Sequence, residues 1–415
     1  MTQIRDYAIV TGAYWGLTLT DGALRMLVLL HFHALGYSPL EIAFLFVFYE
    51  VSGVLTNLIG GWIAARFGLR ITLHAGLAMQ IVALFMLSFV DASWSREFSV
   101  FYVFVCQGLS GIAKDLAKMS SKSAVKLLVS DNSTSTLFKL VALLTGSKNT
   151  LKGIGFFLGG FLLMAMGFQF ALIAMAVSLL FILGVTMALL RMPLGDITIK
   201  PAFRKILSKS KNINLISGAR FFLFGGRDVW FVVAVPLYFR DILDWSYAEI
   251  GSFMAIWVIA YGFVQVIAPR IIKKSQDGLS DEVAAASHWA YGLAATPLLI
   301  AALVYYFVPV DSSVESVDLA TFLLVSGLLV FGALFAVNSS LHSYLILALT
   351  EEENITLDVG FYYMANAAGR LAGTLFSGLF YQIGGLSLCL TGSAAMIVVA
   401  GLIVRRIDLK PPVLV

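Results

Sequence analysis

Apolar stretches close to 20 residues long recur along almost the whole of this sequence. About 20 consecutive apolar residues are needed for a helix to cross the hydrocarbon core of a bilayer, so each stretch predicts a transmembrane helix. Twelve such spans lie near 8–33, 40–65, 72–90, 98–119, 148–167, 169–190, 213–238, 247–269, 286–308, 319–347, 356–380 and 385–404. Only 13% of the 415 residues are charged, against about 25% in soluble domains. The sequence therefore predicts an all-α integral membrane protein.

Several other classes of protein are excluded by composition and motifs. The net charge of +4 is spread between apolar runs rather than gathered in one patch, so no nucleic-acid partner is expected. Cys106 and Cys389 lie in apolar segments, which predicts buried, reduced thiols. The sequence has no Walker loop, H-E-x-x-H or G-x-S-x-G motif, so neither an ATP-driven pump nor a membrane-embedded enzyme is expected, and no cofactor.

The orientation in the membrane follows from the basic residues between the spans. One set of alternate loops holds most of them: Arg66, Arg70, Lys122, Lys126, Lys139, Arg191, Lys200, Arg204, Lys205, Lys209, Lys211, Arg270, Lys273, Lys274, Arg405 and Arg406. The opposite set holds little beyond Arg96 and Arg240. Because loops rich in lysine and arginine stay in the cytoplasm, both termini are predicted to be cytoplasmic.

The chain divides near its middle into two related halves. We predict an N-terminal half at 1–191, a basic cytoplasmic linker at 192–212 and a C-terminal half at 213–415. At a constant offset of 208, Leu35-Gly36-Tyr37-Ser38 with Glu41-Ile42 aligns with Leu243-Asp244-Trp245-Ser246 with Glu249-Ile250. Two pseudo-symmetric six-helix bundles of this kind resemble the major facilitator fold, which implies a midplane substrate site and alternating access.

Two local motifs resemble major facilitators but depart from their pattern. Gly61–Arg70 looks like the loop between the second and third helices, with Ala65 where the family has an acidic residue. Gln107-Gly108 resembles the end of the R-x-x-Q-G motif, with Phe104 at the arginine position. In the family that arginine is associated with proton coupling, so its absence weakens a proton-coupled interpretation.

A third motif, Gly155–Gly160, resembles the G-P-x-x-G-G antiporter motif, with Phe156 in place of proline. Its glycines have two interpretations. They can permit close helix packing, as small residues do in membranes, or they can have a meaning for transport direction.

Charged residues inside the predicted spans are the candidate functional residues, because a charge near the bilayer centre costs about 2.5–3.5 kcal/mol. Counting along each helix at about 1.5 Å per residue places one group in the middle third: Asp21, Arg25, Glu50, Arg227, Asp228 and Arg370. A second group falls in the cytoplasmic third: Lys114, Asp115, Lys152 and Arg220. Positive charges outnumber negative ones, which predicts an anionic substrate. The planar guanidinium suits phosphate, carboxylate or arsenate because it forms two parallel hydrogen bonds.

We assign substrate binding to the cations and to the amide one turn before Arg370: Arg25, Arg227, Arg370, Lys114, Lys152 and Asn366. Counter-ion or coupling roles are assigned to the carboxylates Asp21, Glu50, Asp115 and Asp228. No metal site is expected, because His31 and His33 lack a third ligand and are expected at a solvated interface.

These assignments have simpler alternatives. Asp21 and Arg25, four residues apart, can form an internal ion pair that only makes the first helix insertable. Lys114 and Lys152 can extend toward the headgroups. Arg227 is adjacent to Asp228, so the two cannot share one helix face as well, and a substrate role for Arg227 is favoured.

Beyond the superfamily, three stretches resemble the ArsJ-type organoarsenical efflux permeases of bacterial arsenic-resistance operons. They are Thr18–Ala43, Ser110–Leu128 and Ala142–Gly160, the last two carrying Lys114, Lys118, Lys148 and Lys152. The resemblance implies a bacterial inner-membrane permease that exports 1-arseno-3-phosphoglycerate and confers arsenate resistance. It also implies a functional partner, a glyceraldehyde-3-phosphate dehydrogenase that makes this ester. The alternative function is transport of another organic phosphate or carboxylate anion.

Overall fold

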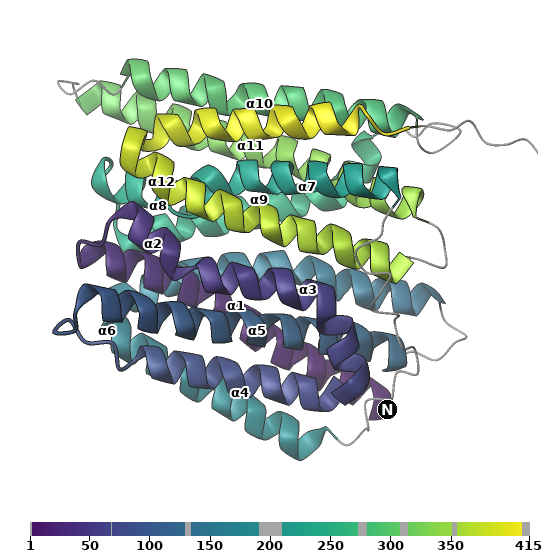
Figure 1. Ribbon diagram of the computed structural model, residues 1–415. Coiled ribbons are helices and arrows are strands. Elements are labelled where there is room, and N and C mark those ends of the chain that lie inside the picture. The colour runs from purple at the N-terminus through teal and green to yellow at the C-terminus, as the bar shows by residue number, and fades with distance from the viewer. Residues whose placement is uncertain are drawn as a thin grey trace, which may run out of the picture. The chain divides into compact units, whose positions relative to one another are not determined.

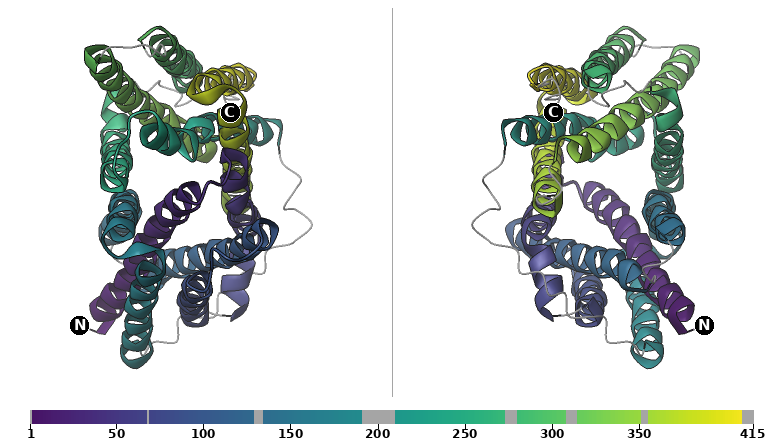
Figure 2. Two further views of the ribbon diagram at one scale, coloured as in Figure 1. Left: turned by 90° about the vertical axis from the view of Figure 1, so that its left-hand side faces the viewer. Right: turned by 90° about the vertical axis from the view of Figure 1, so that its right-hand side faces the viewer.

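The computed structural model describes residues 2–67, 69–128, 134–190, 210–272, 280–307, 314–350 and 355–408. Helices account for the secondary structure of these ranges, and no strand occurs among them (Figures 1 and 2). The helices are α1 (Thr2–Ala34), α2 (Pro39–Leu45), α3 (Val47–Phe67), α4 (Leu69–Leu87), α5 (Arg96–Leu128), α6 (Thr134–Leu189), α7 (Lys211–Phe231), α8 (Ala234–Asp241), α9 (Tyr247–Ile271), α10 (Ser280–Phe307), α11 (Val314–Leu349) and α12 (Ile355–Val404). The predicted all-α class is confirmed.

Nine candidate membrane spans occur among the described residues, and α1 is not one of them. Two of the nine, Ser147–Leu189 in α6 and Leu357–Val404 in α12, contain a break in the helix. The breaks fall at Gly167, with φ 76°, and at Gly384 and Gly385, the latter with φ 61°. Glycine adopts positive φ at no steric cost. Both breaks coincide with borders between predicted spans, but the count of twelve is not confirmed and stays a prediction.

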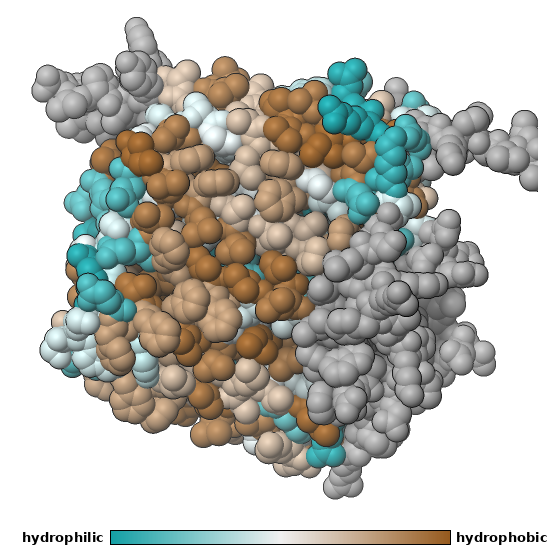
Figure 3. All heavy atoms as spheres, viewed as in Figure 1, coloured by the Kyte–Doolittle hydropathy of each residue, from teal (hydrophilic) through white to brown (hydrophobic). Residues whose placement is uncertain are grey.

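The described surface is apolar over much of its extent, as expected of a protein that faces lipid. Large hydrophobic side chains lie exposed on many helices, among them Phe170 (70%) and Phe181 (73%) on α6. On the face drawn in Figure 3, apolar residues cover most of the described area and hydrophilic residues gather toward its margins. Cys106 and Cys389 are buried free thiols.

The chain forms two compact units. Unit 1 comprises Met1–Pro201 and Phe239–Ile259, and unit 2 comprises Ala202–Tyr238 and Ala260–Val415. Most of the predicted linker, residues 192–209, lies outside the described residues. The division into 1–191, 192–212 and 213–415 remains a prediction.

In unit 1, glycines allow helices to approach closely. A side chain at Gly155 of α6 would meet the Leu19 carbonyl oxygen of α1 at 2.5 Å, and one at Gly159 would collide with Ala23. A side chain at Gly153 would lie 2.9 Å from the carbonyl oxygen of Ala255 in α9. The packing interpretation of the Gly155–Gly160 motif is therefore supported by its contacts.

In unit 2, glycines likewise allow α7 to pack closely along α12. A side chain at Gly373 of α12 would lie 2.5 Å from the Gly225 carbonyl oxygen of α7. Between the end of α7 and the start of α8, the Ser377 hydroxyl oxygen accepts hydrogen bonds from the backbone N–H groups of Val233 and Ala234, at 3.2 and 3.1 Å. This hydroxyl satisfies two donors that the interruption of the helix leaves without intrahelical partners.

The two aligned stretches of the internal repeat have the same local structure. Ser38 precedes α2 and Ser246 precedes α9. In each, the serine backbone N–H donates to a glutamate three residues later at 2.7 Å, and the glutamate N–H donates to the serine hydroxyl at 3.3 Å. Such a reciprocal capping box fixes the start of a helix. The repeat is thus visible as two identical helix starts, with Glu41 and Glu249 in equivalent positions.

Candidate functional site

One cluster of buried charges lies in unit 1, where α1 meets α3. Arg25 Nη2 lies 2.5 Å from Glu50 Oε1, and the two side chains are 7% and 1% exposed. The Arg25 guanidinium also lies over the rings of Phe46 and Tyr49, 5.3 and 5.0 Å from their centroids. Arg25 therefore forms an ion pair with Glu50, a carboxylate on another helix. Asp21, the carboxylate considered for Arg25 from the sequence, lies on the same helix as Arg25.

Tyr49 of α3 connects the predicted residues of this cluster. Its hydroxyl donates to Asp21 Oδ1 at 2.6 Å. The Lys114 ammonium of α5 lies over its ring, 3.9 Å from the centroid. Tyr49 was not among the functional residues predicted from the sequence, because aromatic residues are common in apolar spans. Its position next to Glu50 was the one feature of the sequence that could have indicated it.

Asp115 of α5 has its own set of partners. It is 2% exposed and accepts the Thr56 hydroxyl of α3 at 2.7 Å. Lys118 Nζ lies 3.5 Å from its other oxygen and donates to Asn57 at 3.0 Å. Lys152 of α6 lies 5.5 Å from the centroid of the Phe156 ring. Asp115 thus forms an ion pair with Lys118 in unit 1.

A second cluster lies in unit 2, where α7 packs on α12. Asp228 is fully buried and meets two arginines. Arg227 Nε donates to Oδ1 at 2.6 Å, and Arg370 Nε donates to Oδ2 at 3.2 Å. The expectation that Arg227 and Asp228 are poorly placed to pair is wrong, because the long arginine side chain reaches back to its neighbour. Two guanidinium groups therefore contact one carboxylate.

Arg220, two turns before Arg227 on α7, lies beside this cluster and was not assigned from the sequence. It is 5% exposed. Its Nε donates to Asn366 Oδ1 at 3.1 Å, and its Nη1 donates to the carbonyl and hydroxyl oxygens of Ser339 at 3.0 and 3.1 Å. Asn366, predicted to bind substrate, therefore holds Arg220 in position. Arg220 and Arg227 are seven residues apart, so they lie on one face of α7. This spacing could have indicated from the sequence that Arg220 belongs with Arg227.

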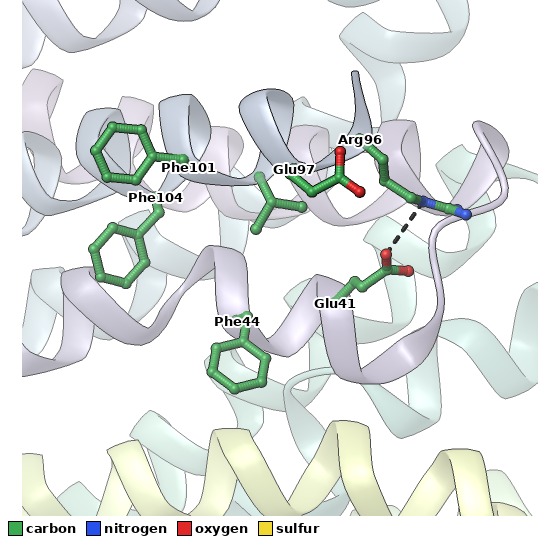
Figure 4. A pocket seen from close by; sticks show the side chains of 7 residues that line it. Glu41, Phe44, Arg96, Glu97, Phe101 and Phe104 are labelled. Carbon is green, nitrogen blue, oxygen red and sulfur yellow. Dashed lines mark ion pairs between the residues drawn. The ribbon is translucent and has the colours of Figure 1, made fainter. Parts of the chain in front are cut away.

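Two surface hollows are separate from these clusters. One, of about 430 Å³, lies between α2 and α5 (Figure 4) and is lined by Glu41, Phe44, Arg96, Glu97, Val100, Phe101 and Phe104. Arg96 Nε lies 3.2 Å from Glu41 Oε1 at its edge. The other lies beside His31 and Phe168, whose rings stack at 3.9 Å. Neither hollow contains a residue that we assigned to substrate binding.

Neither predicted interfacial histidine takes part in a metal site. His33 Nε2 lies 2.6 Å from Asp241 Oδ1, an exposed contact between α1 and the end of α8. Within the part of the chain that the structure describes, no group of three histidine, cysteine or carboxylate side chains is arranged to hold a metal ion.

Comparison with known proteins places this arrangement in a family. The profile of the Major Facilitator Superfamily matches residues 10–346. No curated protein matches the sequence. Similar solved structures include a bacterial homologue of the iron transporter ferroportin in an inward-facing state, at 15% identity and TM-score 0.70, covering 97% of this chain and 98% of that one. They also include a POT family transporter in complex with 5-aminolevulinic acid, at 14% identity and TM-score 0.70, covering 97% and 95%.

A further POT family transporter, in complex with a thioalcohol-conjugated peptide, has 13% identity and TM-score 0.68, covering 97% and 95%. At these identities the likeness shows the fold alone. The profile match extends over most of the chain, and the helices are apolar enough to cross a membrane repeatedly. This multi-pass membrane protein belongs to the Major Facilitator Superfamily, a superfamily of transporters that are typically not enzymes.

Proposed function

We propose that this transporter exports a small organic anion with two anionic groups, and that this anion is 1-arseno-3-phosphoglycerate. The observation that carries the proposal is the group of three arginines where α7 packs on α12 in unit 2. Arg227 and Arg370 both contact the Asp228 carboxylate, and the hydrogen-bond acceptors of Arg220 are all uncharged. Buried charges are costly unless an opposite charge compensates them. A bound anion supplies that compensation.

Unit 1 also carries more cations than carboxylates on the helices that form its charge cluster. Toward the middle of these helices the cations are Arg25, Lys114, Lys118, Lys148 and Lys152, and the carboxylates are Asp21, Glu50 and Asp115. In the proposal, Arg25, Lys114 and Lys152 are the anion-binding groups of unit 1, and Arg227 and Arg370 are those of unit 2. The carboxylates act as counter-ions or coupling groups.

The resemblance to ArsJ-type permeases supports the choice of the arsenic ester. The ester carries an arsenate at one end and a phosphate at the other, and guanidinium groups bind both oxyanions with paired hydrogen bonds. In this proposal the protein lies in a bacterial inner membrane with both termini in the cytoplasm. A dehydrogenase supplies its substrate from arsenate and glyceraldehyde 3-phosphate.

The proposal requires no bound proton. An anion leaving a cell with a negative interior gains about 2.3 kcal/mol per charge per 100 mV, and synthesis of the ester inside the cell adds a concentration gradient. Proton antiport through Asp21, Glu50 or Asp228 is the alternative coupling, and an uncoupler distinguishes the two.

A second candidate is the transport of another organic phosphate or carboxylate. The same arginines favour it, because a guanidinium binds carboxylate in the same bidentate way as phosphate. The two candidates predict the same effect of arginine substitutions and differ only in which anion is moved.

Everted membrane vesicles test the proposal. They are supplied with arsenate, glyceraldehyde 3-phosphate, NAD and a glyceraldehyde-3-phosphate dehydrogenase, and arsenic accumulation inside is followed. Accumulation with the complete mixture, and none when the dehydrogenase is omitted, is the expected result. If sealed vesicles containing the protein accumulate no arsenic, the arsenic ester is not the substrate and transport of another organic anion becomes the better proposal.

A further inference from the structure

Helix α7 carries two arginines that contact the same aromatic ring. The guanidinium carbon of Arg220 lies 4.0 Å, and that of Arg227 5.0 Å, from the centroid of Phe224. Since both distances are to one point, the two carbons lie no more than 9.0 Å apart. Phe335 of α11 packs edge-on against Phe224, with centroids 5.0 Å apart. The result is a pair of cations held at a short, fixed separation along an apolar wall.

The two arginines differ in what compensates their charge. Arg227 shares the Asp228 carboxylate with Arg370. The hydrogen-bond acceptors of Arg220 are all uncharged: an amide oxygen, a carbonyl oxygen and a hydroxyl. Its Nη2 donates no hydrogen bond within the described residues. A guanidinium has five N–H donors, so Nη2 retains two of them for a ligand.

The surroundings of Arg220 orient it and offer further polar groups. The Ser339 hydroxyl, which accepts from Arg220, also contacts the Tyr261 hydroxyl at 3.3 Å and Gln265 Nε2 at 3.4 Å. His342, one turn after Ser339, is fully buried. Among the described residues neither of its ring nitrogens has a hydrogen-bond partner. Buried polar atoms without partners are uncommon and call for an explanation, which a bound oxyanion provides.

We infer that Arg220 forms a second anion-binding position in unit 2, and that it selects substrates with two anionic groups. One group binds at Arg227 and Arg370, and the other, a phosphate or a carboxylate, binds at Arg220 with Phe224 beside the connecting carbons. A three-carbon skeleton with an anionic group at each end fits the separation of the two cations. This inference rests on the proposed function and adds to it the residue that distinguishes doubly from singly anionic substrates.

Two probes with the same three-carbon skeleton test the inference. In 3-phosphoglycerate the phosphate is accompanied by a carboxylate, whereas in glycerol 3-phosphate the carboxylate is replaced by an alcohol. Binding of each to the full-length protein in nanodiscs is measured by isothermal titration calorimetry. The wild-type protein is expected to bind 3-phosphoglycerate at least tenfold more tightly. Arg220→Gln is expected to abolish this preference and to change the affinity for glycerol 3-phosphate less than twofold, and Arg220→Lys to restore part of the preference.

The control is Arg240→Gln, which removes an arginine that is 37% exposed and should leave both affinities unchanged. If Arg220→Gln fails to fold, Ser339→Ala removes one acceptor of Arg220 and should reduce the preference severalfold. A folded Arg220→Gln protein that keeps the wild-type preference overturns this inference and leaves the proposed function intact. A wild-type protein that binds neither probe contradicts the proposed function, and this inference with it.

Discussion

Arg25 in unit 1 and Arg227 in unit 2 are both largely buried in apolar helices, yet their partners differ. Arg25 pairs with Glu50, a carboxylate of another helix, so one cation meets one anion. Arg227 competes with Arg370 for Asp228. A one-to-one ion pair is neutral overall, whereas two guanidinium groups at one carboxylate present more positive than negative groups to an anion. The comparison therefore distinguishes a one-to-one ion pair in unit 1 from a carboxylate that two arginines share in unit 2.

The largest effect on stability is expected where the charges are matched. Glu50→Gln should lower the free energy of unfolding by about 3–5 kcal/mol, because a buried guanidinium loses the carboxylate with which it pairs. Replacing both partners, as Arg25→Met with Glu50→Leu, should recover most of this loss, since an apolar pair is often tolerated at such a position. Unfolding by SDS in mixed micelles measures both changes. Equal losses in the single and the double variant would contradict the matched-pair interpretation.

Tyr49→Phe should have the next largest effect. Asp21 then loses the hydrogen bond from the Tyr49 hydroxyl, and a buried acceptor left unsatisfied costs about 1–3 kcal/mol. The same SDS titration checks the value. Val51→Ala, a change on the same helix that removes no hydrogen bond, is the control. An unchanged free energy of unfolding would show that Tyr49 does not stabilise Asp21.

Much of the fold could be predicted from the sequence, because it depends on local properties. The length of the apolar runs predicts membrane helices, and the breaks at Gly167 and at Gly384 and Gly385 fall where one predicted span ends and the next begins. The internal repeat, in which equivalent residues are 208 positions apart, is also seen in the backbone conformation. Gly36 and its counterpart Asp244 both have positive φ, 78° and 51°.

The candidate site was predicted less completely, because pairing depends on which helices meet. A charge inside an apolar run is visible in the sequence, but its partner on another helix is not. Hence Arg25 was considered with Asp21, while its partner Glu50 was assigned separately. Arg220 was noticed as a charge but not assigned a role, because its neutral partners Asn366 and Ser339 come from α12 and α11.

The two helix starts of the repeat provide a finer test of the comparison. Ser38→Ala and Ser246→Ala should each lower the free energy of unfolding by about 0.5–2 kcal/mol. The backbone capping bonds have the same lengths at both serines, but the Ser246 hydroxyl also donates to Glu249 at 2.7 Å, so the loss at Ser246 should be equal or slightly larger. A loss at only one serine in SDS unfolding would show that the repeat is equivalent in geometry but not in energy.

The smallest change in stability is expected in unit 2. Arg370→Gln should lower the free energy of unfolding by no more than about 1 kcal/mol, the upper range for a typical hydrogen bond or weak ion pair. Asp228 keeps its pair with Arg227, so no carboxylate is left without a cation. A loss as large as that of Glu50→Gln would mean that the arginines of unit 2 are structural, and would remove the contrast between the units.

Transport by the arginine variants tests the central claim most directly. Arsenic accumulation is measured in everted vesicles that contain equal amounts of wild-type protein, Arg227→Gln, Arg370→Gln and, as a control, Arg240→Gln, with the dehydrogenase and its substrates present. The account predicts at least a tenfold loss of accumulation in Arg227→Gln and Arg370→Gln and wild-type accumulation in Arg240→Gln. Full accumulation in both Arg227→Gln and Arg370→Gln would contradict the claim that the arginines around Asp228 bind the transported anion.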